Sequence, residues 1–253
     1  MDPTTTTGGE PRDRSLDAPQ AVVLAGGKGV RLRPYTTLLP QPLVPLGDEQ
    51  SVLEVVLRQL SDQGFSTAHL AIGTLGQLVR AFIGDGSQWG IDVVFVPEDA
   101  PPGTIRPILR ILDNLPEHFV VVHGDCLTNL DFHELLVHHL GSGRPLTVAT
   151  YQREHRVEPG ALEMPGQRFD NFAELSVISC SVSMGVYAVS REALRPYGAG
   201  LPMNFDELML DLIERGTPPS TYRFDGYWLD IGRPEDTDDH VAIPVAEHHT
   251  RPA

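Results

Sequence analysis

The chain has 253 residues, of which 41% are hydrophobic, and it carries a formal net charge of −15 at pH 7. The length fits one large α/β domain or two small ones. The acidity argues against a surface that binds nucleic acid or an anionic membrane. Two cysteines, Cys126 and Cys180, predict neither a disulfide framework nor a metal site. With no signal peptide and no apolar run of membrane-spanning length, a cytoplasmic protein is expected.

Composition and periodicity divide the chain into a domain with two tails. Residues 1–19 are rich in Thr, Gly, Pro and charge and are expected to be a disordered tail, before one domain over 20–240 and a second tail over 241–253. Strands are predicted at 20–25, 68–72, 91–96 and 119–122, with helices near 51–63, 76–83 and 105–113. This alternation indicates an α/β fold of the Rossmann-like kind, with a mostly parallel central sheet flanked by helices.

The pattern changes after residue 145. Strands are predicted at 145–151, 161–163 and 177–189, with few helices between them. A helix over 204–215 and a strand near 220–224 follow. This part is expected to be a smaller antiparallel addition to the same sheet.

The stretch over residues 24–45, LAGGKGVRLRPYTTLLPQPLVP, contains the strongest functional signal. It follows a short buried strand, and its three glycines leave the backbone N–H groups open to a ligand. Lys28, Arg31 and Arg33 add positive charge. A glycine-rich, cationic loop after a strand is typical of phosphate binding, although no Gly-Lys-Ser/Thr closes it.

Two acids are candidates for a metal site. Gly124-Asp125 follows the predicted strand 119–122, where ligands bind in an open parallel sheet. A Gly-Asp pair is equally typical of a turn. Asp230 lies between apolar residues, and its alternative role is a cap or turn acid for the segment that begins at Arg233. Two carboxylates and phosphate oxygens together suit magnesium.

The motifs resemble those of the sugar-phosphate nucleotidyltransferases, also called nucleotide-sugar pyrophosphorylases. Leu24 to Pro45 match that family's opening LAGGxGxRLxPxTxxxPKPLxP nearly throughout. The similarity extends over residues 20–240 and includes Gly84-Asp85-Gly86, Gly103-Thr104, Gly124-Asp125, Met184-Gly185-Val186-Tyr187 and GYWLDIGRPED at 226–236.

The resemblance implies a reaction of a nucleoside triphosphate with a sugar 1-phosphate, or a sugar-like cyclitol phosphate, giving a nucleotide-sugar and pyrophosphate with the help of Mg²⁺. It assigns the antiparallel part to sugar binding, and Arg31 and Asp125 to catalysis. The residues that it assigns to the nucleotide are Leu24, Ala25, Gly26, Gly27, Lys28, Gly29, Arg31, Gln41, Gly103, Thr104 and Arg106. The residues that it assigns to the sugar phosphate are Asp125, Gly160, Glu174 and Gly185, and to the metal Asp125 and Asp230.

Two lysines of the family pattern are absent. Gln41 stands in place of the lysine of Pro-Lys-Pro, and Leu175 in place of that of Glu-Lys-Pro. Each lysine meets a phosphate in the family, and such a charge-assisted contact is worth roughly 1.5–3 kcal/mol. Arg106 stands where the family has a small residue. It could supply a replacement cation, as could Lys28 or Arg33, or it could be a solvated surface residue.

Two main functions therefore remain open from the sequence. The first is an active nucleotidyltransferase. The second is a catalytically degenerate homologue that binds nucleotide or sugar phosphate and regulates or scaffolds a partner, as the missing lysines favour. Transfer to a non-sugar phosphate is a third. The sequence identifies neither the base nor the sugar, and a homo-oligomer is possible.

Overall fold

The computed structural model describes residues 14–27, 29, 36, 38–46, 50–73, 75–98, 103–157, 161–163, 171–173 and 176–231. The strands are β1 (Gln20–Leu24), β2 (Pro45–Leu46), β3 (Gln50–Ser51), β4 (Thr67–Ile72), β5 (Asp92–Pro97), β6 (His118–His123), β7 (Cys126–Thr128), β8 (Leu146–Val157), β9 (Ala161–Glu163), β10 (Asn171–Ala173), β11 (Ser176–Ser190), β12 (Ser220–Phe224) and β13 (Trp228–Asp230). The helices are α1 (Arg14–Asp17), α2 (Val52–Asp62), α3 (Gly76–Ile83), α4 (Arg106–Arg110), α5 (Phe132–Ser142), α6 (Arg191–Leu194) and α7 (Phe205–Glu214), with 3-10 turns η3 (Gln41–Leu43), η4 (Ser87–Trp89) and η5 (Leu112–Asn114).

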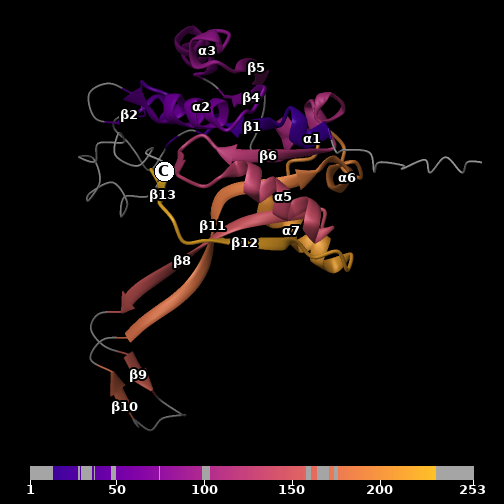
Figure 1. Ribbon diagram of the computed structural model, residues 1–253. Helices are drawn as coiled ribbons and strands as arrows, with labels where there is room; N and C mark the ends of the chain where they lie inside the picture. Colours follow the sequence, from indigo (N-terminus) through magenta and orange to yellow (C-terminus); the bar gives the residue numbers. More distant parts are fainter. Residues whose placement is uncertain are drawn as a thin grey trace, which may run out of the picture.

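A seven-stranded sheet in the order β12-β8-β11-β6-β1-β4-β5 forms the centre of the molecule (Figure 1). The strands β6, β1, β4 and β5 run parallel, whereas β11 is antiparallel to both of its neighbours. The mostly parallel sheet and its antiparallel addition are therefore confirmed. Because β1 and β6 are parallel neighbours, the loops that follow them leave from the same edge.

Helices cover both faces of this sheet, because alternate residues of its buried strands point to opposite sides. Val23 packs in one core with apolar side chains of α2, α3 and α5. Val22 packs in the other with those of α4, α6 and α7. Both valines are fully buried. A capping box begins α2: the Ser51 N–H donates to Glu54 Oε2 at 2.7 Å, and the Glu54 N–H donates to Ser51 Oγ at 3.4 Å.

The predicted elements agree with the structure except in their limits. Helix 76–83 has the predicted bounds. The helix expected near 105–113 is only the five-residue α4 followed by η5. Ile213 of α7 is 55% exposed and does not belong to the buried face of this helix.

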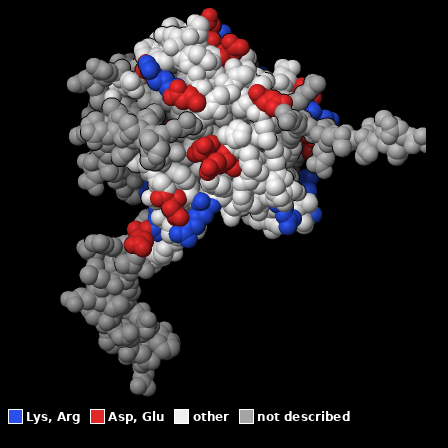
Figure 2. Space-filling model, in the orientation of Figure 1, with Lys and Arg blue, Asp and Glu red and all other residues white. Residues whose placement is uncertain are grey.

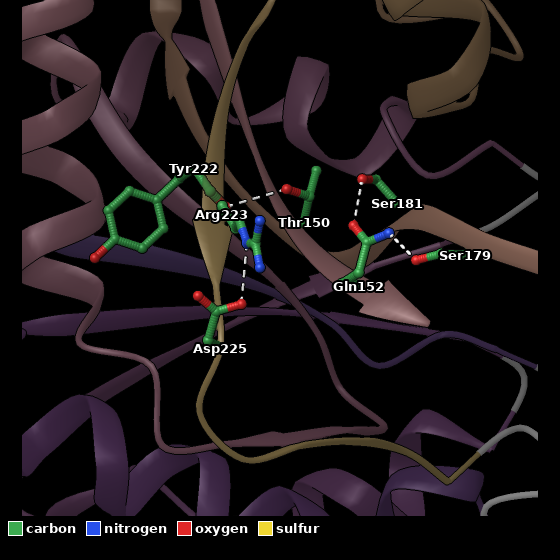
Figure 3. Close-up of polar contacts among 7 residues, drawn as sticks. All are labelled: Thr150, Gln152, Ser179, Ser181, Tyr222, Arg223 and Asp225. Carbon is green, nitrogen blue, oxygen red and sulfur yellow. Dashed lines mark hydrogen bonds and ion pairs between the residues drawn. The ribbon is translucent and has the colours of Figure 1, made fainter. Parts of the chain in front are cut away.

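The strands β8 and β11 extend beyond the body as an arm that carries β9 and β10 at its far end (Figure 1). Polar contacts join the strands where the arm begins (Figure 3). Gln152 Nε2 donates to Ser179 Oγ at 2.5 Å, while its Oε1 accepts from Ser181 Oγ at 3.0 Å. Thr150 Oγ1 donates to the Tyr222 carbonyl of β12 at 3.4 Å. These bonds tie the base of the arm to the sheet.

The visible surface carries mixed charge. Figure 2 shows acidic and basic side chains in small groups, some of them side by side, and within the described part of this face no broad basic area is seen. Among the helices of the described ranges, none is long and apolar enough to cross a membrane.

Candidate functional site

The glycine-rich loop leaves the sheet at the end of β1. There the Gly124 N–H donates to the Leu24 carbonyl at 2.9 Å, and the Ala25 N–H donates to the Ala71 carbonyl at 2.9 Å. These bonds fix the first residues of the loop between the ends of β6 and β4. Gly29 has φ 54°, in the left-handed region that favours glycine. Leu24, Ala25, Gly26, Gly27 and Gly29 of the predicted nucleotide loop thus lie at the edge where an open sheet binds ligands.

Glu98 lies against this loop, and sequence reasoning missed it. A Cβ atom built on Gly26 would be 2.6 Å from both carboxylate oxygens of Glu98. The Glu98 N–H donates to the Ile72 carbonyl at 2.8 Å, which continues the β4–β5 register past the end of β5. The only signal in the sequence is an acid just after a strand that ends at the ligand-binding edge.

Two arginines, Arg106 and Arg110, influence the pKa of the Glu98 carboxyl group. Burial raises the pKa of Glu98 above its ordinary value, and the guanidinium groups of Arg106 and Arg110 oppose that rise. Arg106 is half-buried, and its Nε is buried without a hydrogen-bond partner among the described residues. The solvated-surface alternative for Arg106 is therefore wrong, since the side chain lies beside a half-buried acid.

The Gly103-Thr104 motif is fixed to the start of α7. The Thr104 N–H donates to Asn204 Oδ1 at 3.2 Å, and Thr104 Oγ1 accepts from the Phe205 N–H at 3.2 Å. A Cβ on Gly103 would meet the Met203 backbone at 2.8 Å. Close packing of this loop against α7 accounts for a glycine at this position.

Asp125 and Asp230 lie on neighbouring pieces of backbone. Asp125 is in the turn between β6 and β7, and Asp230 ends β13, which pairs antiparallel with β7 so that Asp230 faces Cys126. The Ile231 N–H donates to the Asp125 carbonyl at 3.1 Å. Trp228 Nε1 anchors β13 by donating to the Met184 carbonyl at 3.0 Å. Two acids that are 105 positions apart in the sequence are thus brought together.

His123 lies close enough to the two acids to feel their charge, and Gly185 packs against its ring. Burial lowers the pKa of His123, and the carboxylates of Asp125 and Asp230 both oppose this. Within the described residues its buried Nε2 has no hydrogen-bond partner. Gly185 has φ 74°, and a Cβ there would lie 3.0 Å from the His123 ring. Gly185 therefore packs on the ring beside Asp125.

Gln41 connects the glycine loop to Asp125. Its Nε2 donates to Asp125 Oδ2 at 2.6 Å. Its Oε1 is 3.7 Å from a Cβ built on Gly27. The side chain is 8% exposed. Gln41 thus contacts one of the two candidate acids.

The donor set of the two acids fits magnesium, which takes one or two carboxylates, keeps several waters and is completed by phosphate oxygens. In the described ranges no group of three or more His, Cys, Asp and Glu side chains is arranged to hold a metal ion. The two carboxylates can hold magnesium without a third protein ligand, because water and phosphate oxygens complete its coordination. Lys28, Arg31, Arg33, Gly160, Glu174 and Leu175 lie outside the described residues.

Comparison with known proteins gives consistent results. Residues 20–241 match the family model described as nucleotidyl transferase. A putative mannose-1-phosphate guanyltransferase of Sulfolobus acidocaldarius is 30% identical over 223 residues, which are 85% of this chain and 60% of that protein. A glucose-1-phosphate adenylyltransferase of Geobacillus stearothermophilus is 23% identical over 251 residues, with 84% and 62% covered. The chain thus spans about 60% of the length of these curated relatives.

A solved structure supports the fold. The crystal structure of HddC from Yersinia pseudotuberculosis has a TM-score of 0.68 and 22% identity, and the match covers 88% of this chain and 97% of that one.

Proposed function

Because the chain belongs to the nucleotidyl transferase family, we propose that it joins a nucleoside triphosphate to a sugar 1-phosphate and releases pyrophosphate. The observation that carries this proposal is the meeting of the glycine loop, Asp125 and Asp230 at one edge of the sheet. The retained acids weigh against a degenerate homologue. A cytoplasmic location is part of the proposal, and the free thiols of Cys126 and Cys180 are compatible with it.

In the proposed reaction, an oxygen of the sugar phosphate forms a bond to the α-phosphorus, and the bond from that phosphorus to the bridging oxygen breaks, so that pyrophosphate leaves. The backbone N–H groups of Gly27 and Gly29, farther along the loop than the contact with Glu98, hold the phosphates in place. Asp125 and Asp230 would hold Mg²⁺, which neutralises phosphate charge. We assign Arg31 to the developing charge, and Gly160, Glu174 and Gly185 to the sugar phosphate. Positioning accounts for most of the expected catalysis.

We further propose that the nucleotide is a guanine nucleotide, and that Glu98 selects it. A carboxylate against the loop would repel a phosphate chain, so its two acceptor oxygens suit a base instead. Guanine offers two adjacent donors, the ring N1–H and the N2 amino group, whereas the pairing edges of adenine, cytosine and uracil each present a single donor group. The absence of a Cβ on Gly26 lets the Glu98 carboxylate lie directly against the loop.

The sequence suggested that Arg106 replaces a missing lysine and contacts a phosphate. In this proposal Arg106 instead keeps the Glu98 carboxylate charged. Arg106 and Arg110 both act on Glu98, and Arg110 Nη1 also donates to the Pro97 carbonyl at 2.5 Å. These guanidinium groups favour the charged carboxylate, the form that accepts two hydrogen bonds. The name of the Sulfolobus relative, a guanyltransferase, points to the same base, and it makes mannose 1-phosphate the first sugar phosphate to test.

The test is pyrophosphate release by the wild type and Glu98→Gln with GTP, ATP, CTP, UTP and dTTP, Mg²⁺ and a panel of sugar 1-phosphates. We expect the wild type to prefer GTP. An amide at position 98 offers one acceptor and one donor, which matches the N3–H and a carbonyl of uracil or thymine. Glu98→Gln should therefore lower kcat/KM for GTP by on the order of a hundredfold relative to UTP or dTTP.

The exposed Glu117 offers a matched control, since Glu117→Gln makes the same chemical change far from the loop. It should leave the order of preference unchanged. A Glu98→Gln variant with the wild-type preference would contradict the assignment of Glu98. A wild type that releases no pyrophosphate from any pair, yet binds nucleotide, would favour the degenerate homologue.

A further inference from the structure

Asn129 joins the turn after β7 to the residue that precedes β13. The Asn129 N–H donates to the Tyr227 carbonyl at 3.2 Å, and the Tyr227 N–H donates to Asn129 Oδ1 at 2.7 Å. Thr128 Oγ1 donates to the same Tyr227 carbonyl at 2.8 Å. A Cβ built on Gly226 would lie 2.7 Å from Asn129 Oδ1, so this glycine lets the two segments approach. We call the contact of Thr128 and Asn129 with the Tyr227 backbone the register clamp.

The register clamp lies at the end of the short ladder that carries Asp230. Strands β7 and β13 pair antiparallel over three residues, with Asp230 opposite Cys126. In the same register Tyr227 lies opposite Asn129, and a continued ladder would take the Tyr227 N–H to the Asn129 carbonyl. That N–H donates to the side-chain oxygen instead. Asn129 thus ends the pairing at a fixed residue, because a side-chain acceptor replaces the ladder acceptor.

The packing of β13 excludes some shifts of register but not all. Leu229 and Ile231 belong to an apolar cluster with residues of α2, and Trp228 and Asp230 lie on the opposite face of the strand. A shift by one residue would turn Asp230 toward that cluster, at the cost of burying its charge. A shift by two residues keeps both faces and moves Asp230 by about 7 Å along the strand. A ladder of two short strands holds its register weakly, so the contacts at its ends decide it.

Helix α2 holds the turn that contains the register clamp. Gln59 Nε2 and Gln63 Nε2 both donate to the Leu130 carbonyl, at 2.9 and 3.0 Å. Gln63 Oε1 accepts from the Phe132 N–H at 2.7 Å. These bonds fix the turn to a helix of the main body, so the position of Asn129 does not depend on β13.

We propose that Asn129 is a positioning residue that fixes the register of β13 and thereby holds Asp230 beside Asp125. The proposal rests on the proposed function, because it takes Asp230 as a ligand of the divalent cation. At the other end of the ladder, the Ile231 N–H donates to the Asp125 carbonyl at 3.1 Å. A shifted β13 would break this bond and separate the two acids.

Two measurements on the full chain test this proposal, and one of them is independent of activity. Trp89 and Trp228 are the two tryptophans of the chain, so a Trp89→Phe background leaves the emission of Trp228 alone. Trp228 is 8% exposed, and its Nε1 donates to the Met184 carbonyl, so a shifted strand would expose it. We expect Asn129→Leu to increase acrylamide quenching of Trp228 severalfold. The same variant should raise the Mg²⁺ concentration for half-maximal pyrophosphate release about tenfold.

Two further variants serve as controls. Asn129→Asp keeps an acceptor oxygen in the same place and should behave as the wild type in both measurements. Asp131 lies two residues further along, and its Oδ1 accepts from the Glu134 N–H at 3.0 Å at the start of α5. Asp131→Ala removes a comparable contact and should lower the thermal midpoint without changing the quenching of Trp228 or the Mg²⁺ requirement. The same result for Asn129→Leu would show a merely structural role and overturn the proposal.

The outcomes separate this proposal from the proposed function. If Asn129→Leu leaves the quenching of Trp228 unchanged, the role of Asn129 is overturned, whatever the activity. If the quenching rises and the Mg²⁺ requirement does not, Asn129 holds β13 but Asp230 does not hold the cation, and the proposal fails together with the metal assignment. If the wild type releases no pyrophosphate, the proposed function fails, and the quenching of Trp228 alone decides whether Asn129 fixes β13.

Discussion

Asp125 is held through its backbone and its side chain at once. Its carbonyl accepts from the Ile231 N–H at 3.1 Å, and its Oδ2 accepts from Gln41 Nε2 at 2.6 Å. Side chains that are fixed in this way position a ligand without reorganisation, which is what a site that works by charge stabilisation needs. Position and chemistry together make Asp125 the first residue to test.

We predict that Asp125→Asn lowers the rate of pyrophosphate release by on the order of a hundredfold or more, because an amide is a poor ligand for Mg²⁺. The variant has nearly the same shape, so the circular dichroism spectrum and thermal midpoint should stay close to those of the wild type. The exposed Asp113 allows the same change outside the site, and Asp113→Asn should be fully active. Equal rates for Asp125→Asn and the wild type would remove Asp125 from the mechanism.

For single residues, the sequence predicted the site well where the residue belongs to a sequence motif. It predicted the site poorly where the role of the residue depends on contacts made only in the folded structure. Asp125 and Asp230 stand in recognisable motifs, and the structure brings them together. Glu98 stands in no such motif. Its importance comes from the register of β4 and β5, which sets it against Gly26. No local pattern encodes a pairing between strands that are separated by a helix.

Among the elements, α5, β6, β8 and β11 meet at a buried polar cluster away from the candidate site. His139 of α5 is 1% exposed. Its ring nitrogens lie 2.9 Å from Thr147 Oγ1 of β8 and 2.9 Å from Ser190 Oγ of β11. Ser190 Oγ also contacts His118 Nδ1 at 3.1 Å. The cluster joins the parallel and antiparallel parts of the sheet through side-chain hydrogen bonds.

We predict that this cluster makes stability depend on pH. Burial, and then the positive charges that His118 and His138 can carry, lower the pKa of His139 from 6.5 to about 4. The unfolded chain therefore binds a proton that the folded chain does not between these values. The contribution of neutral His139 is complete above pH 6.5 and is lost as the pH falls toward 4. The slope is at most about 1.4 kcal/mol per pH unit.

Urea unfolding from pH 7 to pH 4.5 measures this slope, and His139→Gln should flatten it. The exposed His133 of the same helix provides a control, since His133→Gln should keep the wild-type slope. If His139→Gln and the wild type lose stability in parallel, the dependence comes from other groups.

The order of elements predicted the architecture of the whole molecule because alternating strands and helices have few ways to pack. The extent of the arm was less predictable. The strands expected at 145–151 and 177–189 run instead over Leu146–Val157 and Ser176–Ser190. Much of that added length pairs β8 with β11 beyond the body. Polar residues such as Gln152 and Arg153 give no apolar alternation to mark the added part of β8.

Ligand binding should stabilise the molecule as a unit, because the candidate site draws on the ends of β1, β5, β6 and β13. A ligand at 100 times its Kd adds about 2.7 kcal/mol. For a domain of this size, that raises the thermal midpoint by roughly 5–10 °C. We predict this shift for GTP with Mg²⁺ and a smaller one for ATP, CTP or UTP at the same concentration, measured by scanning calorimetry. Glu98→Gln should reduce the shift with GTP, whereas Glu117→Gln should not. Equal shifts with all four nucleotides would show that the site holds the phosphates and does not read the base.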